Sequence, residues 1–186
     1  MADQHLLIRA ARRGDSEAAW PLARAFATSF RPERAAFDVT WERLLDASQT
    51  LLLVAETAER GIVGYLLGNS HLTFHANGPI AWIEELMVDA NHRRSGVGRR
   101  LMDHAEEWAR SGGAAYLALA SRRAGPFYLA LGYQESAAYF KKALNQPDIQ
   151  GSIVTALASF ELIPVGSPLA TTSRGAGDGI RDLQHE

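Results

Sequence analysis

A mixed α/β fold is predicted by two features of this 186-residue chain. Apolar stretches of strand length alternate with segments whose apolar residues recur every three or four positions, the spacing of a helix with one buried face. Two of the strand-like stretches are joined by the short turn Glu59-Arg60-Gly61, which is typical of an antiparallel hairpin. We therefore expect a mostly antiparallel central sheet of six to seven strands, with helices on both faces and no internal repeat.

The expected strands differ in how strongly the sequence marks them. The run Leu51-Leu52-Leu53-Val54-Ala55 is continuously apolar and predicts a strand buried on both faces. A segment at 145–163, apolar from 152 onward, could add a seventh strand or a short helix, and 164–186, rich in Gly, Ser, Thr and Pro, is typical of a flexible tail. The six strands are expected at 5–13, 50–57, 62–69 or further past His71, 81–89, 116–120 and 134–143.

Four helices are expected between these strands. Asp15 or Ser16 can cap the first, and the second covers 33–47 with Phe37 and Trp41 facing inward. A short helix at 127–131 is stopped by Gly132. The third helix has the clearest apolar stripe, formed by Val97, Leu101, Ala105, Trp108 and Ala109.

The segment 87–101 (MVDANHRRSGVGRRL) has the pattern of a diphosphate-binding turn. An apolar strand leads into a basic turn that contains Gly96 and Gly98, and an amphipathic helix follows at once. Glycines allow the backbone close to a ligand, and the free N–H groups at a helix start favour an anion. A dinucleotide-binding pattern (G-x-G-x-x-G) fails at Leu101, and no G-x-x-x-x-G-K-[ST] occurs. Positive charge is added by Arg93, Arg94, Arg99 and Arg100.

Two motifs resemble the GCN5-related N-acetyltransferase (GNAT) family. Arg93, Gly96 and Gly98 meet the pattern [Q/R]-x-x-G-x-[G/A], and 124–133 (AGPFYLALGY) is similar to A-x-x-F-Y-x-x-x-G-[F/Y]. The resemblance covers roughly 6–144 and implies an acyl-CoA N-acyltransferase fold for this N-acetyltransferase domain. It also implies that acetyl-CoA is the co-substrate and that its acetyl group passes to a primary amine by direct attack in a ternary complex.

The resemblance assigns the residues that bind the coenzyme. The backbone around Leu86 to Val88 is expected to bond the pantetheine arm and to supply an oxyanion donor. Ser121 stands where many members carry an Asn that bonds the pantetheine, and a serine reaches less far. The full set is Leu86, Met87, Val88, Arg93, Arg94, Ser95, Gly96, Val97, Gly98, Arg99 and Ser121.

Two adjacent carboxylates and one phenol are the candidates for proton transfer. Glu84 and Glu85 lie in an apolar strand, whose alternation is expected to send them to opposite faces. In polyamine acetyltransferases of the family the acidic residue in register with Glu84 is regarded as the base, with Glu85 as the alternative here; both could also be solvated charges. Tyr128 fits the tyrosine that acts as general acid in relatives, or else is a core aromatic.

Composition limits the other function classes. The net charge of −2 gives no support for nucleic-acid binding, and the absence of cysteine excludes disulfides and a cysteine acyl-enzyme. We expect a cytoplasmic protein, monomer or homodimer, with no membrane span and no metal; His71 and His75 have no third ligand nearby.

The sequence does not identify the acceptor more closely than as an amine-bearing small molecule, peptide or protein. A non-catalytic acyl-CoA-binding module and a transferase of longer acyl groups are the alternatives that remain open. The acceptor wall is expected from residues that follow no known code: Phe30, Arg31, Phe37, Trp41 and Tyr139.

Overall fold

The computed structural model describes residues 6–26, 30–142 and 144. The chain divides into two compact units, Met1–Tyr139 and Phe140–Glu186, and all the helices and strands named below belong to the first. The segment expected at 145–163 and the tail expected at 164–186 lie outside the described residues.

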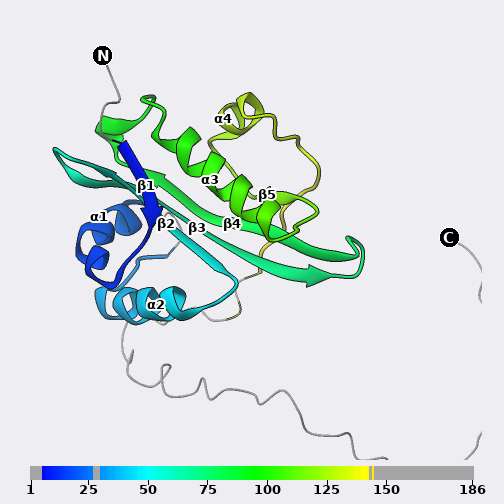
Figure 1. The fold of residues 1–186 in the computed structure, drawn as a ribbon, viewed down its shortest axis with the longest axis horizontal. Helices are drawn as coiled ribbons and strands as arrows, with labels where there is room; N and C mark the ends of the chain where they lie inside the picture. The colour runs from blue at the N-terminus through cyan, green and yellow to red at the C-terminus, as the bar shows by residue number, and fades with distance from the viewer. Residues whose placement is uncertain (1–5, 27–29, 143, 145–186) are drawn as a thin grey trace, which may run out of the picture. The chain divides into compact units, whose positions relative to one another are not determined.

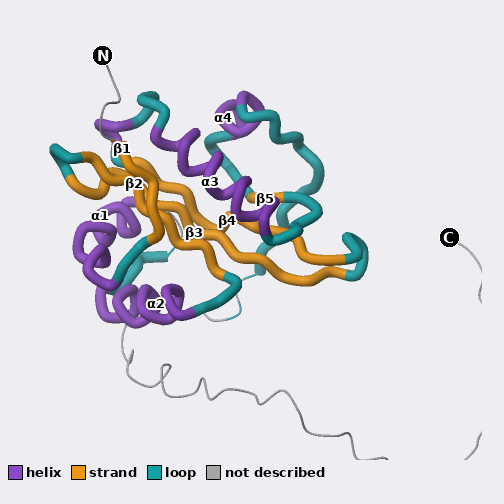
Figure 2. The backbone as a smooth tube through the Cα atoms, in the orientation of Figure 1, coloured by secondary structure: helices purple, strands orange, loops and turns teal. Residues whose placement is uncertain are grey.

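The centre of the first unit is a five-stranded sheet in the order β1-β2-β3-β4-β5 (Figures 1 and 2). The first three pairings are antiparallel, and only β4 and β5 run parallel. The expected mixed α/β fold is therefore confirmed, with five strands in the described part of the chain. The strands are β1 (Leu6–Ala10), β2 (Thr50–Thr57), β3 (Gly61–Thr73), β4 (Gly78–Val88) and β5 (Leu117–Leu119).

Helices cover both faces of the sheet, as Figure 1 shows. On one face α1 and α2 enclose an apolar core that includes Trp41, Val54 and Tyr65. On the other face α3 packs Leu101 and Met102, both fully buried, against the strands, and α4 adds to this second core. The helices are α1 (Ser16–Phe26), α2 (Arg34–Asp46), α3 (Val97–Ser111) and α4 (Gly125–Ala130), with 3-10 turns η1 (Arg13–Asp15) and η2 (Ala90–His92).

One expected strand is wrong. Residues 134–142 contain no strand, so the open edge of β5 is not extended by them. This stretch (QESAAYFKK) has two aromatic residues but none of the β-branched residues that favour a pleated strand, and its Glu, Ser, Ala and Lys residues fit such a surface poorly. A hollow of about 1180 Å³ lies between β5, α4 and 134–139 instead.

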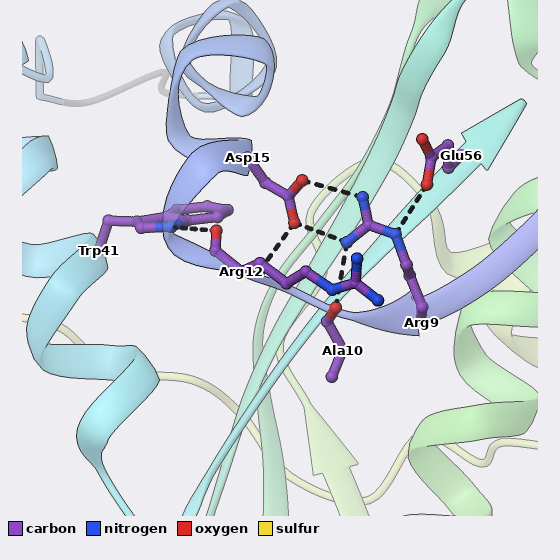
Figure 3. Close-up of polar contacts among 6 residues, drawn as sticks. All are labelled: Arg9, Ala10, Arg12, Asp15, Trp41 and Glu56. Atoms are coloured by element: carbon purple, nitrogen blue, oxygen red, sulfur yellow. Dashed lines mark hydrogen bonds and ion pairs between the residues drawn. The ribbon is translucent and has the colours of Figure 1, made fainter.

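The connection from β1 to α1 is held by a cluster of charged groups (Figure 3). Arg9 donates two hydrogen bonds to the Asp15 carboxylate, at 2.6 and 2.9 Å, and one to Glu56 on β2 at 2.7 Å. Asp15 also accepts from the backbone N–H of Arg12, whose carbonyl accepts from the Trp41 indole at 3.2 Å. The Asp15 carboxylate, expected as a cap of the first helix, therefore ties β1 and η1 together.

Candidate active site

The strands β4 and β5, at one side of the sheet, separate partway along β4. Their last pair is Ile83 with Leu119, whereas β4 continues to Val88. In the described chain no β5 residue pairs with β4 beyond Ile83. Backbone N–H and C=O groups on that edge need partners, so Leu86 to Val88 can bond an extended ligand lying between the strands.

The turn after β4 places the start of α3 beside this open edge. Asp89 accepts a hydrogen bond from the Asn91 N–H at 3.0 Å, and Ser95 Oγ donates to the His92 carbonyl at 2.6 Å. Gly96 then takes a φ of +91°, and α3 begins at the next residue. The first N–H groups of α3 point outward with the positive end of the helix dipole, an arrangement that favours an anion.

The arginines of this turn are placed differently from one another. Arg93 folds back so that its Nε donates to the Val88 carbonyl at 3.2 Å, at the end of β4. Arg94 is exposed with a φ of +62°, and Arg99 reaches the Ala130 carbonyl of α4 at 3.5 Å. Val97 is buried, so only its backbone can serve a ligand. The guanidinium groups of Arg93 and Arg99 therefore combine a structural contact with positive charge near the turn.

Packing, as well as the turn, favours glycine at position 98. A Cβ at this position would lie 3.3 Å from the Phe127 ring of α4 and 3.9 Å from Val88. The second motif thus packs directly on the first, which gives a physical reason for Phe127 and Gly98 to occur together.

Tyr128 follows Phe127 on α4 and is half-buried. Its ring makes edge contacts with Phe127 and Tyr133, with centroids 5.0 and 5.9 Å apart. Burial raises the pKa of its phenol, so the hydroxyl stays protonated at neutral pH. Ser121 is exposed in the preceding loop, where its Oγ accepts from the Ala124 N–H at 3.1 Å and its own proton can still be donated.

A β-bulge in β4 overturns the expectation that Glu84 and Glu85 face opposite sides. Ile83 pairs with Gly68 and Glu85 with Leu67, so Glu84 is an extra residue on β4. The bulge shifts the side-chain alternation by one position. Glu85 lines the α1–α2 face, and Glu84 accepts a hydrogen bond from Asn69 Nδ2 at 2.8 Å.

The two carboxylates nevertheless lie in different surroundings. Glu84 is exposed, whereas Glu85 is partly buried and accepts a 2.5 Å hydrogen bond from the Tyr65 hydroxyl. Burial raises the pKa of Glu85, the Tyr65 hydrogen bond offsets part of this rise, and the negative charge of Glu84 adds a smaller rise. The sequence did not reveal Tyr65 and Asn69 as partners, although their spacing places both on one face of β3.

The expected acceptor wall is only partly assembled. Phe37 and Trp41 line a cavity between α1, α2 and the sheet, together with Glu85. Tyr139 instead lines the hollow beside β5, and Phe30 is exposed. His75 lies 2.9 Å from the Tyr116 hydroxyl, and no group of three metal-binding side chains occurs among the described residues. No helix in the described segments has the length and apolar character to span a membrane.

Comparison with known proteins agrees with this geometry. The model of the Acetyltransferase (GNAT) family matches residues 16–133. An aminoglycoside N(6')-acetyltransferase type 1 from Acinetobacter genomosp. 13 is 32% identical over 114 residues, covering 56% of this chain and 77% of that relative. The chain belongs to the GNAT family and is an acetyl-CoA-dependent N-acetyltransferase.

Solved structures share the same fold. Glucosamine-6-phosphate N-acetyltransferase from Arabidopsis thaliana gives a TM-score of 0.68 at 18% identity, covering 76% of this chain and 100% of that chain. An acetyltransferase from Trypanosoma brucei gives a TM-score of 0.65 at 22% identity, covering 75% and 99%. At these identities the likeness concerns the fold, and the acceptor must be argued from the residues of this chain.

Proposed function

We propose that this protein transfers the acetyl group of acetyl-CoA to the primary amine of a small molecule by direct attack in a ternary complex. The observation that carries the proposal is the open edge of β4 beyond Ile83, which ends at a glycine turn and the start of α3. The aminoglycoside acetyltransferase relative supports a small amine-bearing acceptor over a peptide or protein.

The coenzyme residues follow from this arrangement. The α3 start, with Arg93, Arg94, Ser95, Gly96, Val97, Gly98 and Arg99, would hold the diphosphate through backbone N–H groups and guanidinium charge. The residues fit, because nothing lies within 4 Å of a Cβ built at Gly96, which leaves room for the ligand. The edge at Leu86, Met87 and Val88 would bond the pantetheine arm, aided by Ser121.

Glu84 is the proposed base. An alkylammonium is almost wholly protonated at neutral pH, with a pKa near 10.4, so it must lose a proton before it can attack. Glu84 is exposed and oriented by Asn69, which suits proton removal through a water molecule. The amine nitrogen then bonds to the thioester carbon and releases its second proton to solvent, while a backbone N–H on β4 stabilises the oxyanion.

Tyr128 is the proposed acid. The C–S bond breaks as the tetrahedral intermediate collapses, and the departing thiolate takes the phenol proton of Tyr128. Burial keeps that phenol protonated across the physiological range, as a proton donor requires. Solvent returns the proton to Tyr128 after the products leave.

Glu84→Gln tests the base most directly. It should lower kcat/KM by roughly 10²-fold, at the low end for acid–base catalysis, and remove the acidic limb of the pH profile. Glu107→Gln on α3, where Glu107 and its partner Arg110 are both exposed, is the matched control and should keep the wild-type profile. Full activity with both pH limbs in Glu84→Gln would move the base elsewhere, with Glu85 as the next candidate.

Tyr128→Phe should reduce kcat by a similar factor, roughly 10²-fold, and alter the alkaline limb of the profile. The affinity for acetyl-CoA, measured by calorimetry, should change little because the hydroxyl acts on the sulfur. A loss of coenzyme affinity in proportion to the lost rate would show that Tyr128 is a binding residue.

Gly96→Asp separates coenzyme binding from chemistry. A carboxylate at the diphosphate site should weaken acetyl-CoA by at least about tenfold, or 1.4 kcal/mol. Unchanged affinity in a folded variant would remove the basis for placing the diphosphate at this turn.

A further inference from the structure

A cavity of about 280 Å³ lies between α1, α2 and the sheet, on the face opposite α3. This volume is just below the range of about 300–1,000 Å³ that holds drug-sized ligands, so the cavity suits a small molecule. It reaches β4 at Glu85, on the part of the strand that continues past the last pair with β5 at Ile83. Its lining consists of Ala19, Ala23, Phe26, Pro32, Glu33, Ala36, Phe37, Thr40, Trp41, Leu44, Leu52, Tyr65, Leu67 and Glu85.

The walls of the cavity are mostly apolar. Phe37 and Trp41 stand one helical turn apart on α2, with ring centroids 5.5 Å apart. The Trp41 indole is anchored by its hydrogen bond to the Arg12 carbonyl at 3.2 Å. Aromatic faces attract both apolar groups and cations, so these walls favour a compact apolar body next to a positive charge.

Charge in the cavity is of one sign. Glu33 and Glu85 are the ionisable carboxylates among the described lining residues, and none of those residues is Lys, Arg or His. Glu85 is the more buried of the two, and it accepts its hydrogen bond from the neutral Tyr65 hydroxyl at 2.5 Å. A partly buried carboxylate beside apolar walls is poorly compensated without a cation, and an ammonium ion supplies one.

Resting on the proposed transfer to an amine, we propose that the acceptor is a compact apolar primary monoamine. Its hydrocarbon or aromatic body fills the cavity against Phe37 and Trp41, and its ammonium group binds Glu85 at the edge of β4. Glu85 is therefore a specificity-determining residue, while the exposed Glu84 beside it takes the proton. The bulge makes this division possible, because Glu84 and Glu85 accept hydrogen bonds from Asn69 and Tyr65, which lie on one face of β3.

The same cavity disfavours the acceptors named for the relatives. A sugar phosphate brings an anion, and no cationic side chain among the described lining residues can meet it. An aminoglycoside brings several ammonium groups and many hydroxyls, whereas the part of the lining that the structure describes offers few polar side chains: Glu33, Thr40, Tyr65 and Glu85. Polar groups left without hydrogen bonds in such walls reduce affinity.

The first test compares three acceptors at saturating acetyl-CoA. We expect kcat/KM for 2-phenylethylamine to exceed that for kanamycin A and for glucosamine 6-phosphate by at least about tenfold. Equal or higher efficiency with kanamycin A or glucosamine 6-phosphate would overturn the proposed acceptor class and leave the transferase function intact. Failure with all three amines, in a protein that binds acetyl-CoA, would overturn the acceptor class and count against transfer to small amines.

The second test concerns Glu85 itself. Glu85→Gln should raise the KM for 2-phenylethylamine by at least about tenfold, with a much smaller change in kcat, because it removes the countercharge and keeps the shape. Glu85→Asp should lie between this variant and the wild type, and Glu107→Gln should match the wild type.

A binding measurement without turnover distinguishes a lost contact from a misfolded variant. Calorimetry of 2-phenylethylamine into the complex of the protein with CoA should show the same loss of affinity in Glu85→Gln, while CoA affinity stays at the wild-type value. An unchanged KM and an unchanged amine affinity in Glu85→Gln would show that the ammonium does not bind Glu85.

Discussion

Asp15 and Glu85 are two carboxylates largely withdrawn from water that meet opposite surroundings. Asp15 receives two hydrogen bonds from Arg9 and one from a backbone N–H, and the Arg9 contact holds its pKa below the usual value (Figure 3). Glu85 receives one hydrogen bond from Tyr65, and burial raises its pKa. The difference separates a carboxylate that stabilises the fold from one that is suited to an incoming cation.

The two carboxylates affect stability with opposite sign. A carboxylate paired with a guanidinium in the folded state contributes to the free energy of unfolding, since both charges are compensated only there. A carboxylate whose charged form is disfavoured by burial subtracts from that free energy at neutral pH. Carboxylates that lower the stability of the fold in this way are common in binding sites, because a bound ligand compensates the buried charge.

The largest expected effect comes from Asp15→Asn. It leaves the Arg9 guanidinium, which is mostly buried, with Glu56 as its remaining charged partner, and should lower the free energy of unfolding by roughly 3 kcal/mol. Urea denaturation measures the change. Glu107→Gln, which breaks an exposed pair, should change stability by less than about 0.5 kcal/mol. An equally small loss of stability in Asp15→Asn would show that Asp15 does not stabilise the fold more than an exposed carboxylate does.

The stabilisation by Asp15 should also depend on pH. Its pKa in the folded state lies below the ordinary value of 3.8, so its contribution is complete above that pH and is lost as the pH falls through the folded value. The stability difference between wild type and Asp15→Asn should therefore be constant from pH 7 to about pH 5 and shrink below about pH 4. Unfolding curves of both proteins across this pH range measure the stability difference. A difference that does not shrink in acid would contradict the pairing of Asp15 with Arg9.

Tyr65→Phe should have a smaller effect. It removes the hydroxyl that donates to Glu85 and should cost about 1.5 kcal/mol at pH 7, the low end for a hydrogen bond to a charged group. The loss should diminish below about pH 4, where the carboxyl is protonated and that bond is weaker. Chemical denaturation at the two pH values measures both changes. A loss that is the same at both would assign the effect to packing of the ring.

Glu85→Gln should change stability least, and in the opposite direction. The raised pKa means that the folded state binds more protons than the unfolded one above the ordinary value of 4.5, so wild-type stability falls as pH rises through that window. The variant lacks this fall and should be slightly more stable than the wild type at pH 7.5, with no gain near pH 4. Thermal unfolding at both pH values tests it. A clear loss at pH 7.5 would make Glu85 a structural residue like Asp15.

Much of the site could be predicted because it depends on local sequence. Gly96 is needed where φ is +91°, and Gly98 where Phe127 packs, so the motif residues mark their own positions. The second helix and the strand at 50–57 were also correct to within a residue, because apolar periodicity reports on burial. The assignments of Glu84, Tyr128 and the coenzyme residues remain predictions.

Three features could not be predicted in this way. The strand expected at 134–143 depended on finding a partner at the edge of β5, which local alternation does not guarantee. The role of Asp15 depended on Arg9 and Glu56, which come from two different strands. The orientation of Glu84 and Glu85 depended on an extra residue in one strand relative to its neighbour.

The sequence by itself determined the class of this protein, because the family's glycine turn at a helix start requires particular residues at fixed short spacings. Only the tertiary structure decided which carboxylate lines the cavity between α1, α2 and the sheet and which lies in solvent. A bulge is a mismatch between two strands, and burial is a property of everything packed around a side chain. Neither can be read from one strand alone, so Glu84 and Glu85, adjacent and chemically alike, became different only when the sheet and the two helices partly covered Glu85 and left Glu84 exposed.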